Sequence, residues 1–114
     1  MKATEETFGQ FWLRYLRAHA NPACRGFHYA ASSWALACLI ALAITREPLA
    51  LLAGFVGAYG LAWIGHFFVE GNTPLAFTRP VYSLAADYLM FARALTGRLG
   101  PELLRAGVVA SQRR

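Results

Sequence analysis

Two long apolar stretches occupy the middle of the chain and dominate its pattern. Twenty residues without Asp, Glu, Lys or Arg separate Arg25 from Arg46, and twenty-two separate Glu47 from Glu70. A helix needs about 20 predominantly apolar residues to cross a bilayer, so each stretch predicts one membrane-spanning helix. Because the connection at residues 45–48 is very short, the two helices are expected to form an antiparallel hairpin.

Small residues interrupt the second apolar stretch. Its glycines are Gly54, Gly57, Gly60 and Gly65. Small side chains let the backbones of membrane helices approach each other closely. Gly57 and Gly60, together with Ala53 and Ala58, are therefore expected to allow close approach of the helices.

The segment before the hairpin has helical periodicity. Over residues 4–18 the large apolar side chains recur at the spacing of one helix face, namely Phe8, Phe11, Trp12, Tyr15 and Leu16. Thr4 is placed to cap the start of this helix, and Asn21-Pro22 is placed to end it. The pattern predicts an amphipathic helix whose aromatic face packs on the protein or anchors it in the membrane.

A third helix is predicted over residues 80–95, from Pro80 in its first turn to the stop signal Thr96-Gly97. Its apolar positions form a stripe of Val81, Leu84, Ala85, Tyr88, Ala92 and Leu95. The segment is short for a membrane span and carries Asp87 and Arg93. It is therefore expected to lie along the membrane interface, packed on the hairpin. Residues 101–110 predict a further short helix.

These elements predict an all-α membrane protein. Its two-span transmembrane hairpin is preceded by an amphipathic helix and followed by an interfacial helix. The chain of 114 residues is long enough for one domain, so residues 1–114 are expected to form a single membrane-embedded unit. Its core is expected at residues 7–98, with a basic tail at 99–114. Only 15% of the residues are charged, against roughly 25% in soluble proteins, which favours a membrane protein.

The charge distribution indicates which partners the protein binds and how it is oriented in the membrane. The net charge is +5, but the basic residues are dispersed, so anionic lipid headgroups are a better match than nucleic acid. Four basic residues precede the first span, one lies in the connection, and six follow the second span. The positive-inside rule then predicts an integral membrane protein with both termini cytoplasmic, in the inner membrane if the source is bacterial. The opening MKATEETFGQ has no apolar run and does not resemble a signal peptide.

The hairpin is expected to gather the three histidines of the chain at one end. His28 lies seventeen residues before Thr45, and His66 lies eighteen residues after Pro48. At about 1.5 Å per residue, His28 and His66 are at nearly the same depth. His19 ends the amphipathic helix on the same side.

Glu70 follows His66 by one helical turn and shares its face. A carboxylate in a last helical turn faces the negative end of the helix dipole, so a nearby cation would compensate it. Imidazoles with one carboxylate suit a transition metal such as iron or zinc. The predicted metal ligands are therefore His19, His28, His66 and Glu70.

A structural alternative stays open at this point. Each histidine can instead be a hydrogen-bonded anchor at the membrane interface, and Glu70 can pair with Arg79 or Arg25. Cys24 lies between two of the histidines but is expected to be a thiol without a role. Asp87 is expected to be an ion-pair partner on a helix surface.

Two motifs carry a resemblance to a known family. The first is FWLRYLRAHANPACRGFH, with the pattern His-x-Asn-Pro-x5-His, and the second is WIGHFFVEGNTPLAF, with the pattern Gly-His-x3-Glu-x3-Pro. A weaker match follows at residues 82–97. Over residues 7–98 the chain resembles the membrane-embedded 2-hydroxy fatty acid dioxygenases, typified by an enzyme that removes one carbon during phytosphingosine breakdown.

This resemblance implies a specific activity. It implies an iron(II)-dependent enzyme that uses dioxygen to shorten a long-chain 2-hydroxy fatty acid by one carbon. His19, His28 and His66 fall on histidines of the family, and Glu70 falls on its glutamate, as a ligand or just outside the ligands. Arg25 or Arg79 would offset the charge of the substrate, so the expected catalytic residues are Glu70, Arg25 and Arg79.

The chain is short for this family, and two spans make a small pocket, so a homodimer is a further expectation. The alternative function is a non-catalytic integral membrane protein that binds lipid or a protein partner and keeps the histidines as structure.

Overall fold

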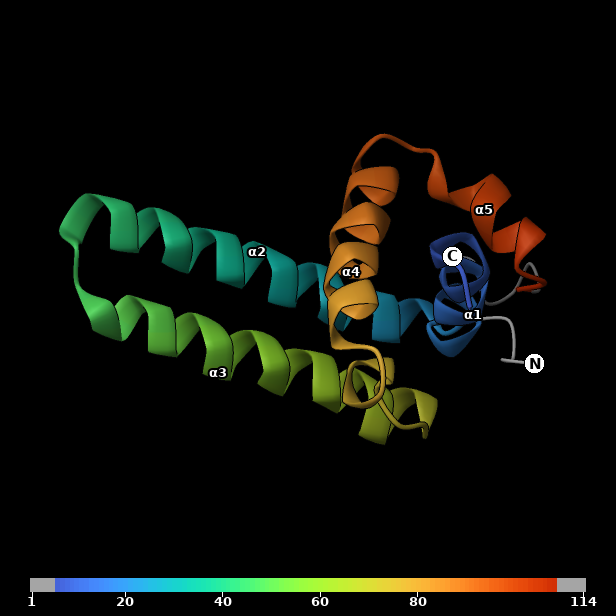
Figure 1. Ribbon diagram of the computed structural model, residues 1–114, viewed down its shortest axis with the longest axis horizontal. Coiled ribbons are helices and arrows are strands. Elements are labelled where there is room, and N and C mark those ends of the chain that lie inside the picture. The colour runs from blue at the N-terminus through green and yellow to red at the C-terminus, as the bar shows by residue number, and fades with distance from the viewer. Residues whose placement is uncertain (1–5, 109–114) are drawn as a thin grey trace, which may run out of the picture.

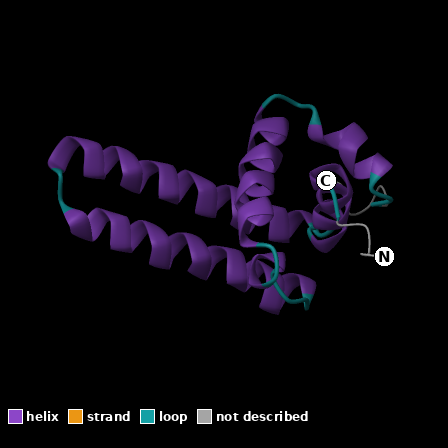
Figure 2. Cartoon of the chain, in the orientation of Figure 1, coloured by secondary structure: helices purple, strands orange, loops and turns teal. Residues whose placement is uncertain are grey.

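The computed structural model describes residues 6–108, and within this range it contains five α-helices and no strand. The α-helices are α1 (Phe8–Ala18), α2 (Pro22–Thr45), α3 (Pro48–Ile64), α4 (Pro80–Leu95) and α5 (Leu99–Arg105). A π-helix, η1 (Gly65–Glu70), continues α3, and a short 3-10 helix, η2 (Leu75–Phe77), precedes α4. The predicted all-α architecture is confirmed (Figures 1 and 2).

Helices α2 and α3 run antiparallel as the predicted hairpin (Figure 1). Each begins with a proline, which suits the first turn because its missing N–H has no helical partner there. Arg46 adopts a left-handed backbone with φ of 57°, so the chain reverses within two residues. Residues 22–45 and 48–70 are both long and apolar enough to cross a membrane.

Close approach within the hairpin depends on three of the four glycines. A Cβ placed at Gly57 would lie 2.2 Å from Nε1 of Trp34, whose indole donates a hydrogen bond to the carbonyl of Ala53. At Gly54 a Cβ would lie 3.1 Å from Cβ of Cys38. At Gly60 it would meet nothing within 4 Å, so the expectation for Gly60 is wrong. This glycine faces away from α2.

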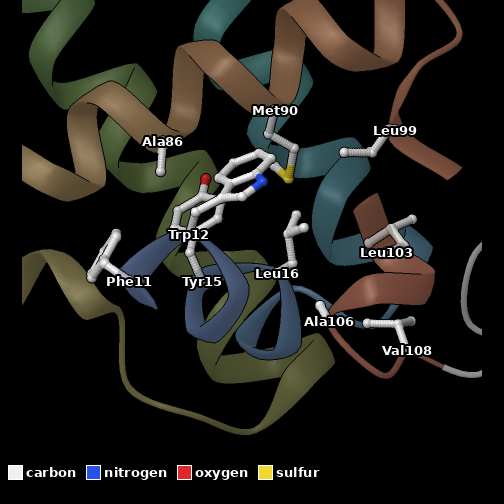
Figure 3. Packing of buried hydrophobic residues seen from close by; sticks show 10 residues of the cluster. All are labelled: Phe11, Trp12, Tyr15, Leu16, Ala86, Met90, Leu99, Leu103, Ala106 and Val108. Atoms are coloured by element: carbon white, nitrogen blue, oxygen red, sulfur yellow. The ribbon is translucent and has the colours of Figure 1, made fainter. Parts of the chain in front are cut away.

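Helix α1 packs across the open end of the hairpin together with α4 and α5 (Figure 1). Thr7 and Gln10 cap its start reciprocally, each side chain accepting from the backbone N–H of the other. The predicted cap, Thr4, lies outside the described residues. The aromatic face of α1 forms the core of the protein with residues from α4, α5 and the turn that follows (Figure 3): Phe11, Trp12, Tyr15, Leu16, Ala86, Met90, Leu99, Leu103, Ala106 and Val108.

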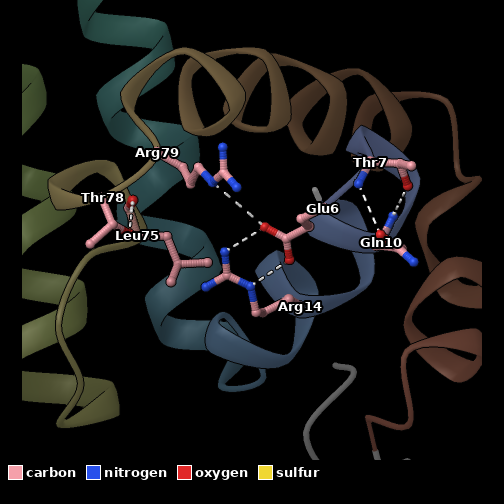
Figure 4. A network of polar contacts seen from close by, with 7 residues as sticks. All are labelled: Glu6, Thr7, Gln10, Arg14, Leu75, Thr78 and Arg79. Atoms are coloured by element: carbon pink, nitrogen blue, oxygen red, sulfur yellow. Dashed lines mark hydrogen bonds and ion pairs between the residues drawn. The ribbon is translucent and has the colours of Figure 1, made fainter. Parts of the chain in front are cut away.

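An ion-pair network joins the start of α1 to the start of α4 (Figure 4). Glu6 accepts two hydrogen bonds of 2.8 Å from Arg14, and Nε of Arg79 lies 3.8 Å from the same carboxylate. These side chains are partly exposed, so the network contributes little to the free energy of unfolding. It does define which end of α4 lies beside α1.

Helix α4 has the predicted bounds and crosses the hairpin near its open end (Figure 1). The apolar stripe recognised in its sequence is exposed at all six positions, whereas Ser83, Ala86 and Met90 are buried. The outward surface of a membrane protein is itself apolar, so a hydrophobic stripe does not identify the face that packs on protein. The buried face of α4 is the less hydrophobic one, with Asp87 at its edge, while Leu84 and Tyr88 of the stripe line an apolar groove beside the hairpin.

Candidate metal centre

Three imidazole rings meet at the open end of the hairpin. His19 caps the end of α1, His28 lies in the second turn of α2, and His66 lies in η1. Nε2 of His28 is 3.1 Å from Nε2 of His19 and 3.1 Å from Nε2 of His66. All three side chains are buried. The hairpin thus brings His28 and His66 to one depth, as the spacing predicts.

The opposite nitrogen of each ring faces an oxygen. Nδ1 of His19 is 2.7 Å from the backbone oxygen of Tyr15, and Nδ1 of His28 is 3.3 Å from a carboxylate oxygen of Asp87. Nδ1 of His66 is 2.7 Å from Oδ1 of Asn72. Carbonyl and carboxylate oxygens only accept, so the ring proton belongs on Nδ1 in each case.

The arrangement leaves three Nε2 lone pairs facing one another. Two unprotonated nitrogens cannot form a hydrogen bond, so a contact of 3.1 Å between them is repulsive without a cation. Nitrogens about 2.0–2.1 Å from one ion, at angles between roughly 90° and 109°, lie about 2.8–3.4 Å apart. The observed spacing therefore fits two ligands of one metal ion.

Burial keeps the groups around this centre in the required protonation states. Burial, and then the neighbouring His28 and His66, lowers the pKa of His19 well below its ordinary value, which favours the neutral ligand form. Burial, and then the charge of Asp87, raises the pKa of Tyr15 well above its ordinary value. The hydroxyl of Tyr15 therefore stays protonated and donates a hydrogen bond to Asp87.

Asp87 and Asn72 are residues that sequence reasoning missed. Asp87 was expected to form a surface ion pair, and the structure instead places it between Tyr15 and His28. Asn72 donates to the backbone oxygen of Ala18 at 3.0 Å, which directs its amide oxygen to His66. The feature of the sequence that could have identified Asp87 is the presence of a carboxylate within an apolar helix. Asn72 was missed although His66 is only six residues away, because its role also depends on the distant backbone oxygen of Ala18.

Glu70 is oriented away from the three Nε2 atoms. Its carboxylate accepts a hydrogen bond from the backbone N–H of Asn21, the residue that caps α2. The positive end of the α2 dipole thus compensates a carboxylate at the end of its own helix. The four donor atoms that the structure brings within 4.8 Å of one another belong to His19, Cys24, His28 and His66, and Glu70 is not among these four residues.

The two arginines expected to offset a substrate charge have other partners. Nη1 of Arg25 donates to the backbone oxygens of His19 and Ala20, at 2.8 and 2.9 Å, and so holds the turn between α1 and α2. Arg79 pairs with Glu6 and lies over the ring of Tyr82. Neither guanidinium group lines the cavity beside the histidines.

That cavity is an apolar groove of about 480 Å³ between α2, α3 and α4. The histidines lie at one end with Tyr15 and Asp87. From there the groove follows the hairpin past Leu36 and Phe55 to Leu39 and Leu51. An elongated apolar ligand with a polar head matches this shape, with the head at the histidines.

The fold and the centre together define the class: an all-helical protein with two candidate membrane-spanning helices and a cluster of three histidines and one cysteine that could hold a metal ion. The chain belongs to the Mpo1-like family, described as 2-hydroxy-palmitic acid dioxygenase Mpo1-like, which matches residues 5–99. The resemblance recognised in the two motifs is thereby confirmed. Neither the curated proteins nor the solved structures include a significant match to this chain.

Proposed function

We propose that this protein is an iron(II)-dependent membrane dioxygenase that shortens a long-chain 2-hydroxy fatty acid by one carbon. The observation that carries the proposal is the set of three inward-facing Nε2 atoms at the end of an apolar groove. The family description names 2-hydroxy-palmitic acid as a substrate. An acid of this kind combines an apolar tail with two oxygen-bearing groups at one end.

His19, His28 and His66 would hold the metal. Imidazoles suit iron(II) among other borderline metals, and three of them leave coordination positions open. Bound iron would supply the activation of dioxygen. Cleavage of the C1–C2 bond with dioxygen as the only oxidant balances as R–CH(OH)–COOH + O2 giving R–COOH, CO2 and H2O. Four electrons pass from the two carbons to dioxygen, so the reaction needs no further reductant.

The residues of the chain would hold the substrate and the ligands in place. The apolar walls of α2 and α3 would bind the tail and keep water away from the head. Tyr15 and Asp87 would orient His28, and Asn72 would orient His66. Oxygen acceptors of this kind on the distant ring nitrogen fix the orientation of metal-bound histidines.

The experiment is anaerobic purification in detergent, followed by iron(II) loading, elemental analysis and product analysis with 2-hydroxyhexadecanoic acid. We expect about one iron per chain and, on admission of oxygen, a product one carbon shorter. His66→Ala should abolish both metal binding and turnover. Glu70→Gln should retain iron, because the carboxylate bonds to Asn21 and not to the centre. Cys24→Ser should also retain iron, because the three imidazoles alone would hold the metal.

Two outcomes would contradict the proposal. Stoichiometric zinc that does not exchange for iron, with no product from any 2-hydroxy acid, would refute the oxygenase function. Wild-type protein free of any metal after careful loading would instead favour a non-catalytic lipid-binding protein, for which the same apolar groove supplies a site.

A further inference from the structure

The buried hydroxyl group of Ser83 in the cavity has no partner. Ser83 is only 4% exposed and lines the groove, and its Oγ makes no hydrogen bond within the described part of the chain. A buried hydroxyl without a partner destabilises a fold. Within the described residues, the other buried side-chain atom without a hydrogen bond is Nε of Arg93, and Arg93 does not line the groove. Ser83 is therefore the polar group whose partner a ligand in the groove would supply.

The helix end beside Ser83 favours an anion. The cap residue of α4, Arg79, makes no side-chain hydrogen bond to the first turn, and Pro80 has no N–H. The first-turn N–H groups of Val81 and Tyr82 thus have no capping side chain, and the end carries the partial positive charge of the helix dipole. Pro80 and Leu84 line the groove beside Ser83, so the N-terminal end of α4 borders it.

Ser83 also lies along α4 about one helical turn from the residue that contacts His28. Asp87 follows it by four residues, which places both side chains on one helix face about one turn apart. Asp87 in turn contacts His28. No Lys or Arg lines the described cavity, and its one carboxylate, Asp87, is bound by Tyr15 and His28. Ser83, buried and without a partner beside the uncapped turn, is placed to donate a hydrogen bond to a negative head group.

We propose that Ser83 and the first turn of α4 bind the carboxylate of the fatty acid, in the role that the sequence assigned to Arg25 or Arg79. This inference rests on the proposed function for the identity of the ligand. The Ser83 hydroxyl donates a hydrogen bond to a carboxylate oxygen, which leaves the 2-hydroxyl and C2 on the side of the histidines. The residue determines specificity for an acid head over a neutral one.

The test compares two probes of equal chain length, 2-hydroxyhexadecanoic acid and hexadecane-1,2-diol, which lacks the carboxylate. Binding is measured to metal-free protein and to iron(II)-loaded protein kept free of oxygen, so that no turnover occurs. Ser83→Ala should weaken binding of the acid about 10-fold and leave that of the diol within about 2-fold. Ser83→Thr, which keeps the hydroxyl, should restore binding of the acid. Ser33→Ala, at an exposed position of α2, is the matched control.

The outcomes separate this inference from the proposed function. Unchanged binding of the acid to Ser83→Ala, or an equal loss for acid and diol, overturns the carboxylate site even if the enzyme is active. Selective loss of acid binding in a protein that shows no turnover supports the site and refutes the dioxygenase. Thermal unfolding in detergent shows whether Ser83→Ala is folded, and Ser83→Thr provides the comparison if it is not.

Discussion

The imidazole of His28 is the central ring of the candidate centre. Its Nε2 faces both other histidines, while its Nδ1 faces Asp87, which also accepts from Tyr15. A partly buried carboxylate without these donors would be destabilising, so the three side chains stabilise one arrangement together. The position of one nitrogen is thus controlled from α1, α2 and α4 at once.

Replacing Asp87 by Asn should weaken metal binding without removing a ligand. Asn keeps the shape but has one acceptor oxygen and no charge, so it cannot serve Tyr15 and His28 equally well. Loss of such an outer partner typically lowers metal affinity about 10–100-fold. Chelator competition with iron(II) under nitrogen measures the affinity. Glu102→Gln is the matched control, because that carboxylate bonds to Trp12 away from the histidines. Equal affinity of Asp87→Asn and the control would exclude the positioning role.

The π-helix at the end of α3 places two of the polar side chains. The backbone oxygen of His66 accepts from the N–H groups of Gly71 and Asn72, at 2.7 and 2.9 Å. Gly71 has φ of 75°, a left-handed conformation that glycine adopts without strain. The chain therefore reverses direction directly after η1, and the side-chain amide of Asn72 reaches the ring of His66. Single-turn π-helices of this kind are frequent at functional sites.

The contact of α2 with η1 depends on Gly65. A Cβ there would lie 3.2 Å from Sγ of Cys24 and 3.3 Å from its backbone oxygen, and backbone cannot rotate away. Gly65→Ala should separate the helices by a few tenths of an ångström beside His66 and lower iron affinity. Gly60→Ala is the control, since it meets no neighbour and should stabilise α3 by about 0.5–1 kcal/mol. Metal affinity and thermal unfolding of both variants test this, and equal behaviour would refute the close contact.

At the scale of the molecule, the hairpin has the dimensions and surface of a membrane element. The 24 residues of α2 extend about 36 Å at about 1.5 Å each, against about 30 Å of bilayer hydrocarbon. Large apolar side chains on its outer surface are exposed, including Ile44, Val56 and Phe68. Soluble proteins rarely expose so continuous an apolar surface. Lipid would cover it, and the predicted homodimer would cover part of it.

The orientation in the membrane is a prediction that reporter fusions can test. The excess of basic residues at both ends over the single Arg46 in the connection predicts cytoplasmic termini. His28 near the start of α2 and His66 in η1 lie at the end of the hairpin opposite the connection, so the centre would face the cytoplasm. A fusion after Arg114 should report a cytoplasmic position, and one between Arg46 and Glu47 the opposite side. A C-terminus on the outer side would contradict the orientation.

Several features of this protein followed from the sequence because they depend on local spacing. Runs of apolar residues determine the two candidate membrane-spanning helices, and a two-residue turn forces them antiparallel. Equal distances from that turn then bring His28 and His66 to one depth. The helical spacing of large apolar side chains over residues 8–16 likewise identified the buried face of α1. The two histidine motifs were sufficient to indicate the family.

Tertiary packing decided which groups surround the centre. The crossing of α4 over the hairpin brings Asp87 to His28 and Ser83 into the groove. The turn at Gly71 brings Asn72 to His66, and the start of α2 binds Glu70 instead of leaving it as a fourth donor. Hydrophobicity could not predict these contacts, because in lipid the outer face of a helix is as apolar as the inner one. They depend on the angles at which distant elements meet, which no local pattern encodes.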